Sequence, residues 1–441
     1  MGMALAYRLV GDGHQVHVIE RESQLGGLAT WYDFGGFDWD RFYHVILPTD
    51  LELIQFVNDI GLGEKLRWQE TQTGFYVDQK FHSLNDTLDF IKFPPLSIWG
   101  KFRLALTILY CARINNWRRL EKILVEDWLI RVSGRSTYEK MWKPLLLAKL
   151  GENYKRVSAV FIWSYIKRLF SARDSSAQKE QMGHVSGGYK AVFQRLVECI
   201  NARGGVIHCG SNVQKISADK NAGIWLERDY KREHFDKIVF TSPVNILRNI
   251  CDPELVKIEN DQRDVEYLGV ICMVLITHKP IVPYYVLNIA DQRIPFTGVV
   301  GMSTVVDPKE TAGRHVTYFP KYVLSTDPLL GAKEAELRET FMRGARLMFP
   351  DYDWSAVESI HINRAIKVQP LQVLDYSTLV PRCVTEHPDF FVLNTSQFVN
   401  NTLNNNAVIH SVNEFWSQYR HRLTEEADRS VDLSEIKSAS A

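Results

Sequence analysis

The sequence has no excess of charge of either sign and few cysteines. Lys and Arg total 52, Asp and Glu total 52, and the formal net charge is zero. A chain without a basic excess lacks the electrostatic footprint of a nucleic-acid-binding protein, so we expect no nucleic-acid partner. The six cysteines form no Cys-x-x-Cys pair and no zinc-ligand spacing, so we expect no metal site. Unpaired cysteines are typical of a reducing compartment, and we predict a cytoplasmic protein.

Long apolar runs are missing too. A membrane-spanning helix needs ~18 apolar residues in a row, and residues 104–112 reach about half that length. Arg8 interrupts a short apolar stretch at the start, and no basic segment precedes it, so a signal peptide is not indicated. The sequence also has no His-Glu-x-x-His segment, no phosphate-binding P-loop and no Ser-His-Asp order. We therefore expect neither an integral membrane protein nor a member of those enzyme classes.

The first twenty residues, MGMALAYRLVGDGHQVHVIE, predict a helix over 1–9 and a strand over 15–20. In a dinucleotide-binding βαβ unit, the third glycine of Gly-x-Gly-x-x-Gly opens the helix, and an acidic residue ~20 positions later binds the ribose. Gly2 and Glu20 fit these two roles. The other interpretation is an ordinary αβ unit with a surface glutamate. Under the first interpretation, the chain as given lacks the first strand and the first two glycines.

The rest of the chain divides by pattern into a mostly helical stretch, 50–170, and a mixed stretch that follows it. In the mixed stretch a glycine turn opens a helix at 189–202, and a second helix is predicted at 333–349. The predicted strands are 206–208, 213–216, 223–227, 237–241, 267–278, 314–324 and 389–395. Residues 31–46, with paired glycines at their centre, predict a short hairpin or an extended loop.

A glycine pair follows the acidic residue in ERESQLGGLA, and small residues there let the main chain approach a phosphate or a ribityl chain. The ordered set of Glu20, this glycine pair, DFGG and DWDRFYH resembles the FAD-binding fold of the amine oxidase, protoporphyrinogen oxidase and phytoene desaturase superfamily. UDP-galactopyranose mutases share that fold. GHVSGGYKAVFQRL, DKIVFTSP and FFVLNTSQFVNNTLNNNAVIHSV fit the same family in the expected order.

The resemblance implies an α/β fold in which an FAD-binding, Rossmann-like domain with a parallel sheet is combined with a mixed-sheet and helical substrate or cap domain. It also implies that the FAD-binding domain is discontinuous. The expected segments are 1–90 (FAD-binding, first part), 91–183 (helical cap), 184–250 (FAD-binding, second part), 251–385 (substrate-domain sheet), 386–423 (FAD-binding, last strand and helix) and 424–441 (a polar, disordered tail).

The resemblance also implies FAD as cofactor, bound non-covalently because no segment for covalent flavin attachment is present. The last predicted helix opens with an asparagine run, and a helix N-terminus offers free N–H groups to an anionic cofactor. In isolation, that run also reads as an ordinary surface cap. The expected FAD-binding residues are Gly2, Glu20, Arg21, Gly26, Gly27, Leu28, Val213, Thr241, Thr395, Ser396, Asn405, Asn406 and Ala407.

The catalytic candidates are Arg41, His44 and Lys321. Because the glycine-rich loop leads directly to DRFYH, the resemblance puts Arg41 and His44 near the flavin, where a histidine can relay a proton near neutral pH. Lys321 and Tyr322, in YFPKY, are expected to line the substrate face. The alternative for each of them is a packing or surface role.

The leading hypothesis is an FAD-dependent oxidoreductase that oxidises or desaturates a small organic substrate by hydride transfer to flavin. Two alternatives stay open: a flavin-dependent isomerase of the sugar-mutase type, and a non-catalytic fragment. The segment FPPLSIWGKFRLALTILYCARINNWRR, residues 93–119, also has two interpretations. Its apolar stripe either packs on the core or gives the protein a peripheral contact with a membrane surface.

Overall fold

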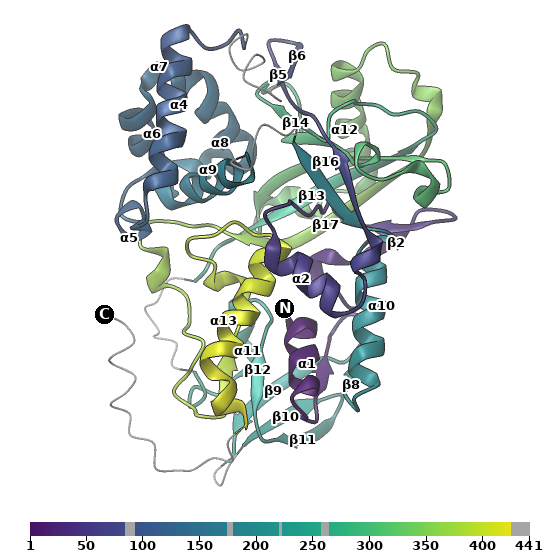
Figure 1. Cartoon of the computed structure of the whole chain (residues 1–441), viewed down its shortest axis with the longest axis vertical. Helices are drawn as coiled ribbons and strands as arrows, with labels where there is room; N and C mark the ends of the chain where they lie inside the picture. Colours follow the sequence, from purple (N-terminus) through teal and green to yellow (C-terminus); the bar gives the residue numbers. More distant parts are fainter. Residues whose placement is uncertain (84–92, 174–179, 220–222, 257–263, 425–441) are drawn as a thin grey trace.

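The computed structural model describes residues 1–83, 93–173, 180–219, 223–256 and 264–424. In the view of Figure 1, one half of the molecule contains both ends of the described chain, with α1 beside α10 and α13. The other half contains a large sheet and a group of helices.

The lower half in Figure 1 is built around two pairs of short parallel strands. β1 (His17–Ile19) pairs with β8 (Val206–His208), and β12 (Ile238–Phe240) pairs with β18 (Phe390–Val392). Helices cover one face of these strands and share one apolar core with them. These helices are α1 (Gly2–Gly11), α2 (Leu51–Asp59), α10 (Gly188–Asn201) and α13 (Asn405–Thr424).

The opposite face of the parallel strands packs on an antiparallel sheet. Its strands are β9 (Val213–Ala218), β10 (Ile224–Arg228) and β11 (Lys231–Phe235), with the short helix α11 (Leu247–Ile250) beside β9. Ile19 of β1 packs into the same core as Phe240 of β12 and Phe390 of β18. The two strand pairs therefore form one layer between the helices and the antiparallel sheet, the layered arrangement of an α/β domain.

The second half is organised on a seven-stranded mixed sheet in the order β17-β13-β16-β15-β14-β5-β6. Only the β14–β5 pairing is parallel. All of β13 is buried, and its alternate side chains enter different cores on the two faces of the sheet. The bounds are β5 (Thr73–Val77), β6 (Lys80–Ser83), β13 (Tyr267–Thr277), β14 (Val286–Ile289), β15 (Gly298–Gly301), β16 (His315–Leu324) and β17 (Val357–Pro370).

Helices flank this sheet on two sides in Figure 1. α12 (Glu334–Met348) buries Leu337, Phe341 and Met348 in one of the two sheet cores. The helical group on the other side encloses a separate apolar core. Its members are α4 (Ile98–Arg113), α5 (Trp117–Leu120), α6 (Val125–Ser133), α7 (Arg135–Thr137), α8 (Lys143–Leu150) and α9 (Ala159–Arg173), with a π-helical turn at Tyr138–Trp142. None of the helices in the described part of the chain is long and apolar enough to cross a membrane.

The predicted α/β class is confirmed, as are the helix at the start, the helix at 333–349 and a hairpin, β2 (Trp31–Asp33) with β3 (Asp38–Asp40). The prediction of a mostly helical stretch from residue 50 is confirmed for α2 but wrong for residues 66–83. β4 (Leu66–Glu70) lies there, followed by β5 and β6. β4 pairs with β7 (Gln181–Val185), and β5 pairs with β14 more than a hundred residues later, so distant partners fix these strands.

The predicted segment boundaries stay a prediction. β5 and β6 lie within the predicted first FAD-binding segment but belong to the seven-stranded sheet. The helix α13 ends at Thr424, and the predicted disordered tail beyond it lies outside the described residues.

Candidate flavin site

The carboxyl ends of the four parallel strands carry the first group of predicted site residues. Glu20 follows β1, Thr241 follows β12, and Thr395 follows β18 by three positions. In open α/β sheets, ligands bind outside the carboxyl ends of the strands. The structure therefore collects residues from three distant parts of the sequence at the edge where this fold class binds ligands.

Gly2 brings the N-terminus of α1 against the end of β12. A Cβ atom at Gly2 would lie 3.1 Å from Thr241 Oγ1, which is tighter than ordinary contact. No side chain caps this helix in the described structure, so its first amides are not used by a capping residue. A helix N-terminus with open amides and a partial positive charge suits an anionic group.

Glu20 lies in a tight local arrangement with the end of β8. Its carbonyl oxygen accepts a hydrogen bond from Ser211 N at 2.9 Å, and its Oε1 atom accepts one from Glu22 N at 2.9 Å. Arg21 points to the surface and pairs with Glu22. Val213 is half-buried and is the first residue of β9, which begins five residues after the end of β8.

The glycine pair at 26–27 provides backbone that other residues adopt poorly. Gly26 has a φ of +122°, and a Cβ there would lie 3.2 Å from the Ala29 and Thr30 backbone. Gly27 has a φ of +58°, and a Cβ there would meet nothing within 4 Å. Gly27 is exposed and Leu28 is half-buried. The first glycine closes the turn, and the second leaves open space along the main chain, as close approach of a cofactor requires.

The predicted residues before and within α13 divide into two groups. Ser396 is fully buried, and Asn406 Oδ1 accepts a hydrogen bond from Leu53 N at 2.9 Å, so both side chains already serve the fold. Thr395 and Asn405 are half-buried, and Ala407 is buried below them. Asn404 Oδ1 accepts a hydrogen bond from Ala407 N at 2.9 Å and caps the helix.

Arg41 and His44 lie beside a buried carboxylate. Asp40 Oδ1 accepts a hydrogen bond from Tyr189 N at 2.9 Å, and Asp40 Oδ2 lies 3.7 Å from His44 Nδ1. The His44 and Tyr189 rings meet edge to face at 5.2 Å between centroids, and burial raises the pKa of Tyr189. Arg41 Nε and His44 Nδ1 are buried and have no hydrogen-bond partner in the described structure. Orphaned buried polar atoms are costly, and a bound ligand would satisfy them.

Lys321 does not join this cluster. Its Nζ atom donates a hydrogen bond to Pro295 O at 2.8 Å, and burial lowers the pKa of the amine. Strand alternation sends Tyr322 to the opposite face of β16, where its hydroxyl lies 2.7 Å from that of Tyr43. Lys321 therefore lies apart from Arg41 and His44, and its catalytic role stays a prediction.

Tyr322 belongs to a tyrosine and lysine cluster on the Tyr43 side, and the other members of this cluster were not found from the sequence. Lys149 Nζ, from α8, lies 3.9 Å from the centroid of the Tyr322 ring and 5.5 Å from that of Tyr165. The Tyr165 hydroxyl donates to Gln369 Oε1 at 3.3 Å. The members come from α8, α9, β16, β17 and the loop at 41–44, so no local motif announces them. They lie where three parts of the fold meet, a frequent place for small-molecule sites.

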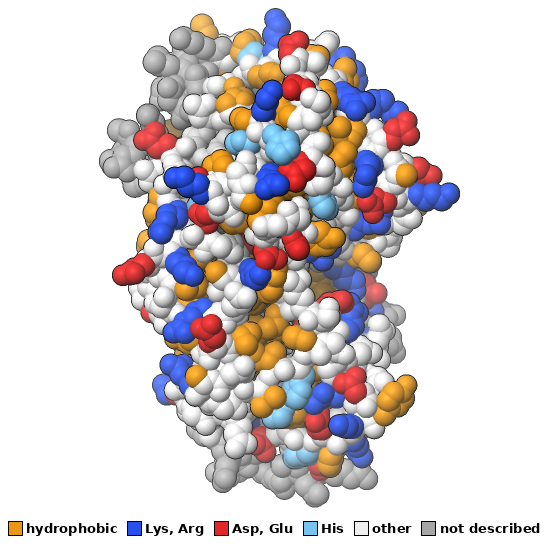
Figure 2. All heavy atoms as spheres, turned by 90° about the vertical axis from the view of Figure 1, so that its right-hand side faces the viewer, with side chains coloured by type: hydrophobic (Ala, Val, Ile, Leu, Met, Phe, Trp, Pro, Cys, Tyr) orange, Lys and Arg blue, Asp and Glu red, His pale blue; other side chains and the backbone are white. Residues whose placement is uncertain are grey.

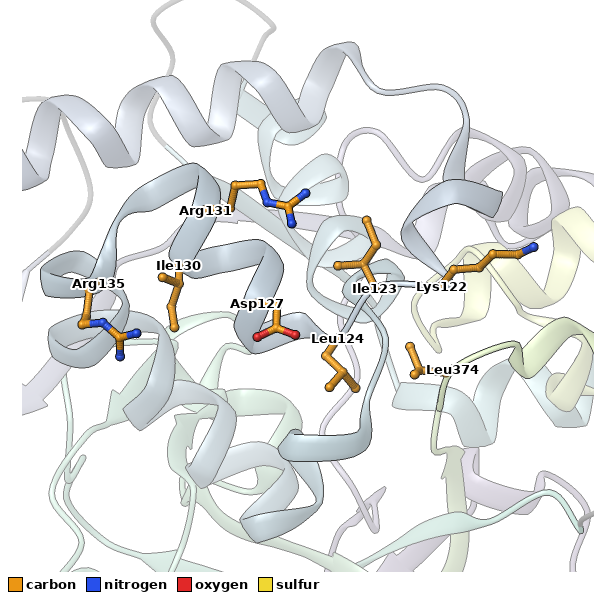
Figure 3. A pocket seen from close by; sticks show the side chains of 8 residues that line it. All are labelled: Lys122, Ile123, Leu124, Asp127, Ile130, Arg131, Arg135 and Leu374. Carbon is orange, nitrogen blue, oxygen red and sulfur yellow. The ribbon is translucent and has the colours of Figure 1, made fainter.

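A surface pocket of about 520 Å³ lies elsewhere, in the helical group (Figure 3). Its lining contains three cationic side chains and one carboxylate, and none of the predicted site residues. The lining residues are Lys122, Ile123, Leu124, Asp127, Ile130, Arg131, Arg135 and Leu374. Among the described residues, no group of three His, Cys, Asp or Glu side chains is placed to hold a metal ion.

The comparison with protein families matches residues 2–364 to the model described as "Flavin containing amine oxidoreductase". The chain belongs to the flavin containing amine oxidoreductase family. This membership agrees with the resemblance carried by Glu20, the glycine pair and the DRFYH segment, and it implies a flavin cofactor.

Among curated proteins, the chain is similar to 15-cis-phytoene desaturase from Glycine max, with 21% identity over 290 residues, 61% of this chain and 50% of the relative. It is also similar to mitochondrial protoporphyrinogen oxidase from Nicotiana tabacum, with 21% identity over 304 residues, 58% of each chain. The chain thus spans about half the length of the curated relatives it matches.

Among solved structures, an oxidoreductase from Methanosarcina mazei matches with a TM-score of 0.72 and 18% identity, covering 94% of this chain and 97% of that one. At this identity the likeness shows the fold alone. The predicted fold, an α/β flavin-binding domain joined to a mixed sheet and helical part, is confirmed.

Proposed function

We propose that this chain is an FAD-dependent oxidoreductase that oxidises or desaturates a small organic substrate. Family membership supports the flavin, and two curated relatives are named for a desaturation and an oxidation. The observation that carries the proposal is the collection of Gly2, Glu20 and Thr241 at the carboxyl ends of parallel strands, next to a helix N-terminus without a capping side chain.

The described residues fit non-covalent FAD at several independent points. The amides at the start of α1 suit the pyrophosphate, and the Glu20 carboxylate suits the ribose hydroxyls. Gly27 leaves open space beside the main chain. Arg41 Nε and His44 Nδ1 are buried without a hydrogen-bond partner in the described structure, as expected of groups that face a ligand, although His44 Nδ1 has the Asp40 carboxylate 3.7 Å away.

When bound, FAD supplies the two-electron acceptor. The contribution of the protein is then to position the substrate and to handle a proton. His44 is the side chain best placed for a proton, because it lies on the same loop as Arg41 and beside the Asp40 carboxylate. The buried hydroxyls of Tyr43 and Tyr322 provide a polar point on an otherwise apolar wall, which orients a substrate by hydrogen bonding.

Reconstitution with FAD tests the cofactor assignment. The purified chain is incubated with FAD, passed through a desalting column, and examined by visible absorption. Retained, protein-bound flavin is the expected result, and its complete absence would contradict the proposal. Adding candidate substrates under anaerobic conditions then tests for bleaching of the bound flavin, the sign that the substrate has been oxidised.

A matched pair of glycine variants tests where the cofactor lies. Gly27→Asn and Gly13→Asn both place asparagine at a positive φ with no atom within 4 Å of the new Cβ. Asparagine tolerates this backbone, so we expect similar stability for the two variants. Gly13 lies before β1, at the edge away from the strand carboxyl ends. FAD affinity should fall only in Gly27→Asn, and equal affinity in both variants would argue against the placement.

The isomerase alternative differs from the proposed function in whether an electron acceptor is consumed. An oxidase or desaturase consumes one electron acceptor for each substrate molecule, whereas a sugar mutase needs reduced flavin and consumes none. Incubation of the reduced protein with nucleotide sugars distinguishes them. Ring contraction without consumption of an acceptor would replace the proposed function with that of a mutase.

A further inference from the structure

The helix α4 exposes an unusual amount of apolar surface. Six large apolar or aromatic side chains along its sixteen residues have exposed fractions between 40% and 87%. The two at its beginning, Trp99 and Phe102, stack with their ring centroids 5.4 Å apart. The six residues are Ile98, Trp99, Phe102, Leu106, Leu109 and Tyr110. On soluble proteins, contiguous exposed apolar patches mark interaction surfaces.

The side of α4 that faces the protein carries a different set of residues, and these are buried. Gly100, Leu104, Thr107 and Cys111 are buried and repeat at helical spacing. At 100° per residue, the six exposed side chains lie on the opposite side of the helix from these four. The packing interpretation of this segment is confirmed for the side that faces the core, whereas the other side is uncovered and its membrane interpretation stays a prediction. Because a run of large apolar side chains is rarely left exposed on a soluble protein, the outer side of α4 is a candidate contact surface.

The chain segment that contains α4 carries charge of one sign. Residues 93–120 contain no Asp or Glu but include Lys101, Arg103, Arg113, Arg118 and Arg119, in a chain whose total charge is zero. Arg113, Arg118 and Arg119 are exposed and take part in none of the ion pairs of the described structure. The side of the molecule that carries α12 is different, since Figure 2 shows Lys and Arg interspersed with Asp and Glu there. The basic character is therefore local to the apolar helix.

We propose that the outer face of α4 docks on an anionic lipid bilayer, with the helix lying in the interface. An amphipathic helix of this kind buries its apolar side at the boundary of headgroups and acyl chains, and neighbouring basic residues are attracted to anionic lipids. α4 has 16 residues, too few to span the ~30 Å hydrocarbon core. The membrane contact is peripheral.

A second copy of the chain fits this surface less well. A two-fold dimer through α4 would place the same acid-free segment against itself, with Arg113 and its neighbours facing their own copies. Like charges brought together across an interface are unfavourable. An anionic membrane satisfies both the apolar side chains and the surrounding charge.

Vesicle co-sedimentation tests this docking with the full chain. Wild-type protein is mixed with phosphatidylcholine vesicles that contain phosphatidylserine and with vesicles of phosphatidylcholine alone. We expect binding to the anionic vesicles, weaker binding to the neutral ones, and a decrease with added salt. The double variant Trp99→Ser/Phe102→Ser should reduce the partition coefficient by about tenfold or more, because it removes the two stacked aromatic rings.

A matched variant controls for loss of apolar surface in general. Leu347→Ser/Ile366→Ser removes two exposed apolar side chains far from α4 in the sequence, at 47% and 59% exposure. It should bind vesicles as the wild type does. Unchanged circular dichroism and flavin content in both double variants exclude misfolding as the cause of any difference.

Three outcomes would overturn the proposal. In the first, neither vesicle type retains the wild type. In the second, Trp99→Ser/Phe102→Ser binds as strongly as the wild type. Either result removes the membrane role. In the third, the protein forms lipid-independent dimers that Trp99→Ser/Phe102→Ser abolishes, which would assign the surface to a second copy. None of these outcomes depends on whether the chain oxidises a substrate, so the proposal stands or falls apart from the proposed function.

Discussion

Replacement of Asp40 by alanine should destabilise the protein through a helix that lies far away in sequence. The helix α10 begins at Gly188 after Gly187, which has no side chain with which to cap it. The carboxylate of Asp40, a residue with 3% exposure in β3, takes that role by accepting a hydrogen bond from Tyr189 N at 2.9 Å. It therefore connects the hairpin segment to the helix across 149 positions.

The size of the effect follows from two contributions. Loss of a capping side chain costs about 1 kcal/mol and up to about 2. A negative charge at a partly buried helix N-terminus is worth up to about 2 kcal/mol more. We expect Asp40→Ala to lower the free energy of unfolding by about 1–3 kcal/mol. Asp40→Asn keeps an oxygen acceptor for Tyr189 N without the charge, and should lose about half as much.

Urea denaturation followed by circular dichroism measures these differences. Asp38→Ala is the matched control, since Asp38 lies in the same strand and its ion pair with Lys190 is only partly buried. A partly exposed pair contributes at most about 1 kcal/mol, so this variant should remain close to wild type. The reasoning is refuted if Asp40→Ala unfolds like the wild type, or if Asp40→Asn is as unstable as Asp40→Ala.

Three further predictions concern Glu310, Glu20 and Tyr322, which lie in different parts of the structure. Burial alone would raise the pKa of Glu310, but hydrogen bonds from His184, Ser186 and Gly187 N hold it below the usual 4.5. The stability that the Glu310 carboxylate contributes is present above pH 4.5 and is lost as the pH falls through its lower pKa in the folded state. The difference in free energy of unfolding between wild type and Glu310→Gln, measured by urea denaturation, should therefore shrink as the pH is lowered. Glu20→Ala should weaken FAD binding in titration calorimetry while unfolding changes little. Tyr322→Phe should remove its hydrogen bond and reduce substrate turnover more than FAD content, as stopped-flow and absorption would show.

Sequence reasoning succeeded where the signal is local. The helix over the first residues, the strand that ends at Glu20 and the hairpin around DFGG each follow from a short pattern. It failed for β17, the longest strand. The burial along Val357–Pro370 does not alternate regularly, so the period-2 signal of a half-buried strand is weak. The strand exists because it pairs along nearly all of β13, which no local window contains.

The same distinction applies to the candidate site. Glu20 and the glycine pair were identified because the family motif places them close together in sequence. Tyr43 and Tyr322 are separated by 279 positions, and Lys149 comes from a third segment. Aromatic and basic residues are common in any helical stretch, and only tertiary packing selects the ones that meet. The side chains at strand carboxyl ends were predictable, whereas on the opposing wall only Tyr322 was indicated and its neighbours Tyr43 and Lys149 were not.

Two glycine pairs show why a motif gains its meaning from its surroundings. Of the four Gly-Gly pairs in the sequence, Gly26-Gly27 is predicted to let the main chain approach a cofactor, and Gly187-Gly188 is predicted to form a turn that opens a helix. A Cβ at Gly27 would meet nothing, whereas one at Gly188 would lie 3.0 Å from Asp40 Oδ1. The first pair leaves space for a ligand, and the second leaves space for a carboxylate of the protein itself. The residue after Gly188 then receives from Asp40 the cap that a glycine cannot give, so this pair holds the His44 loop against α10.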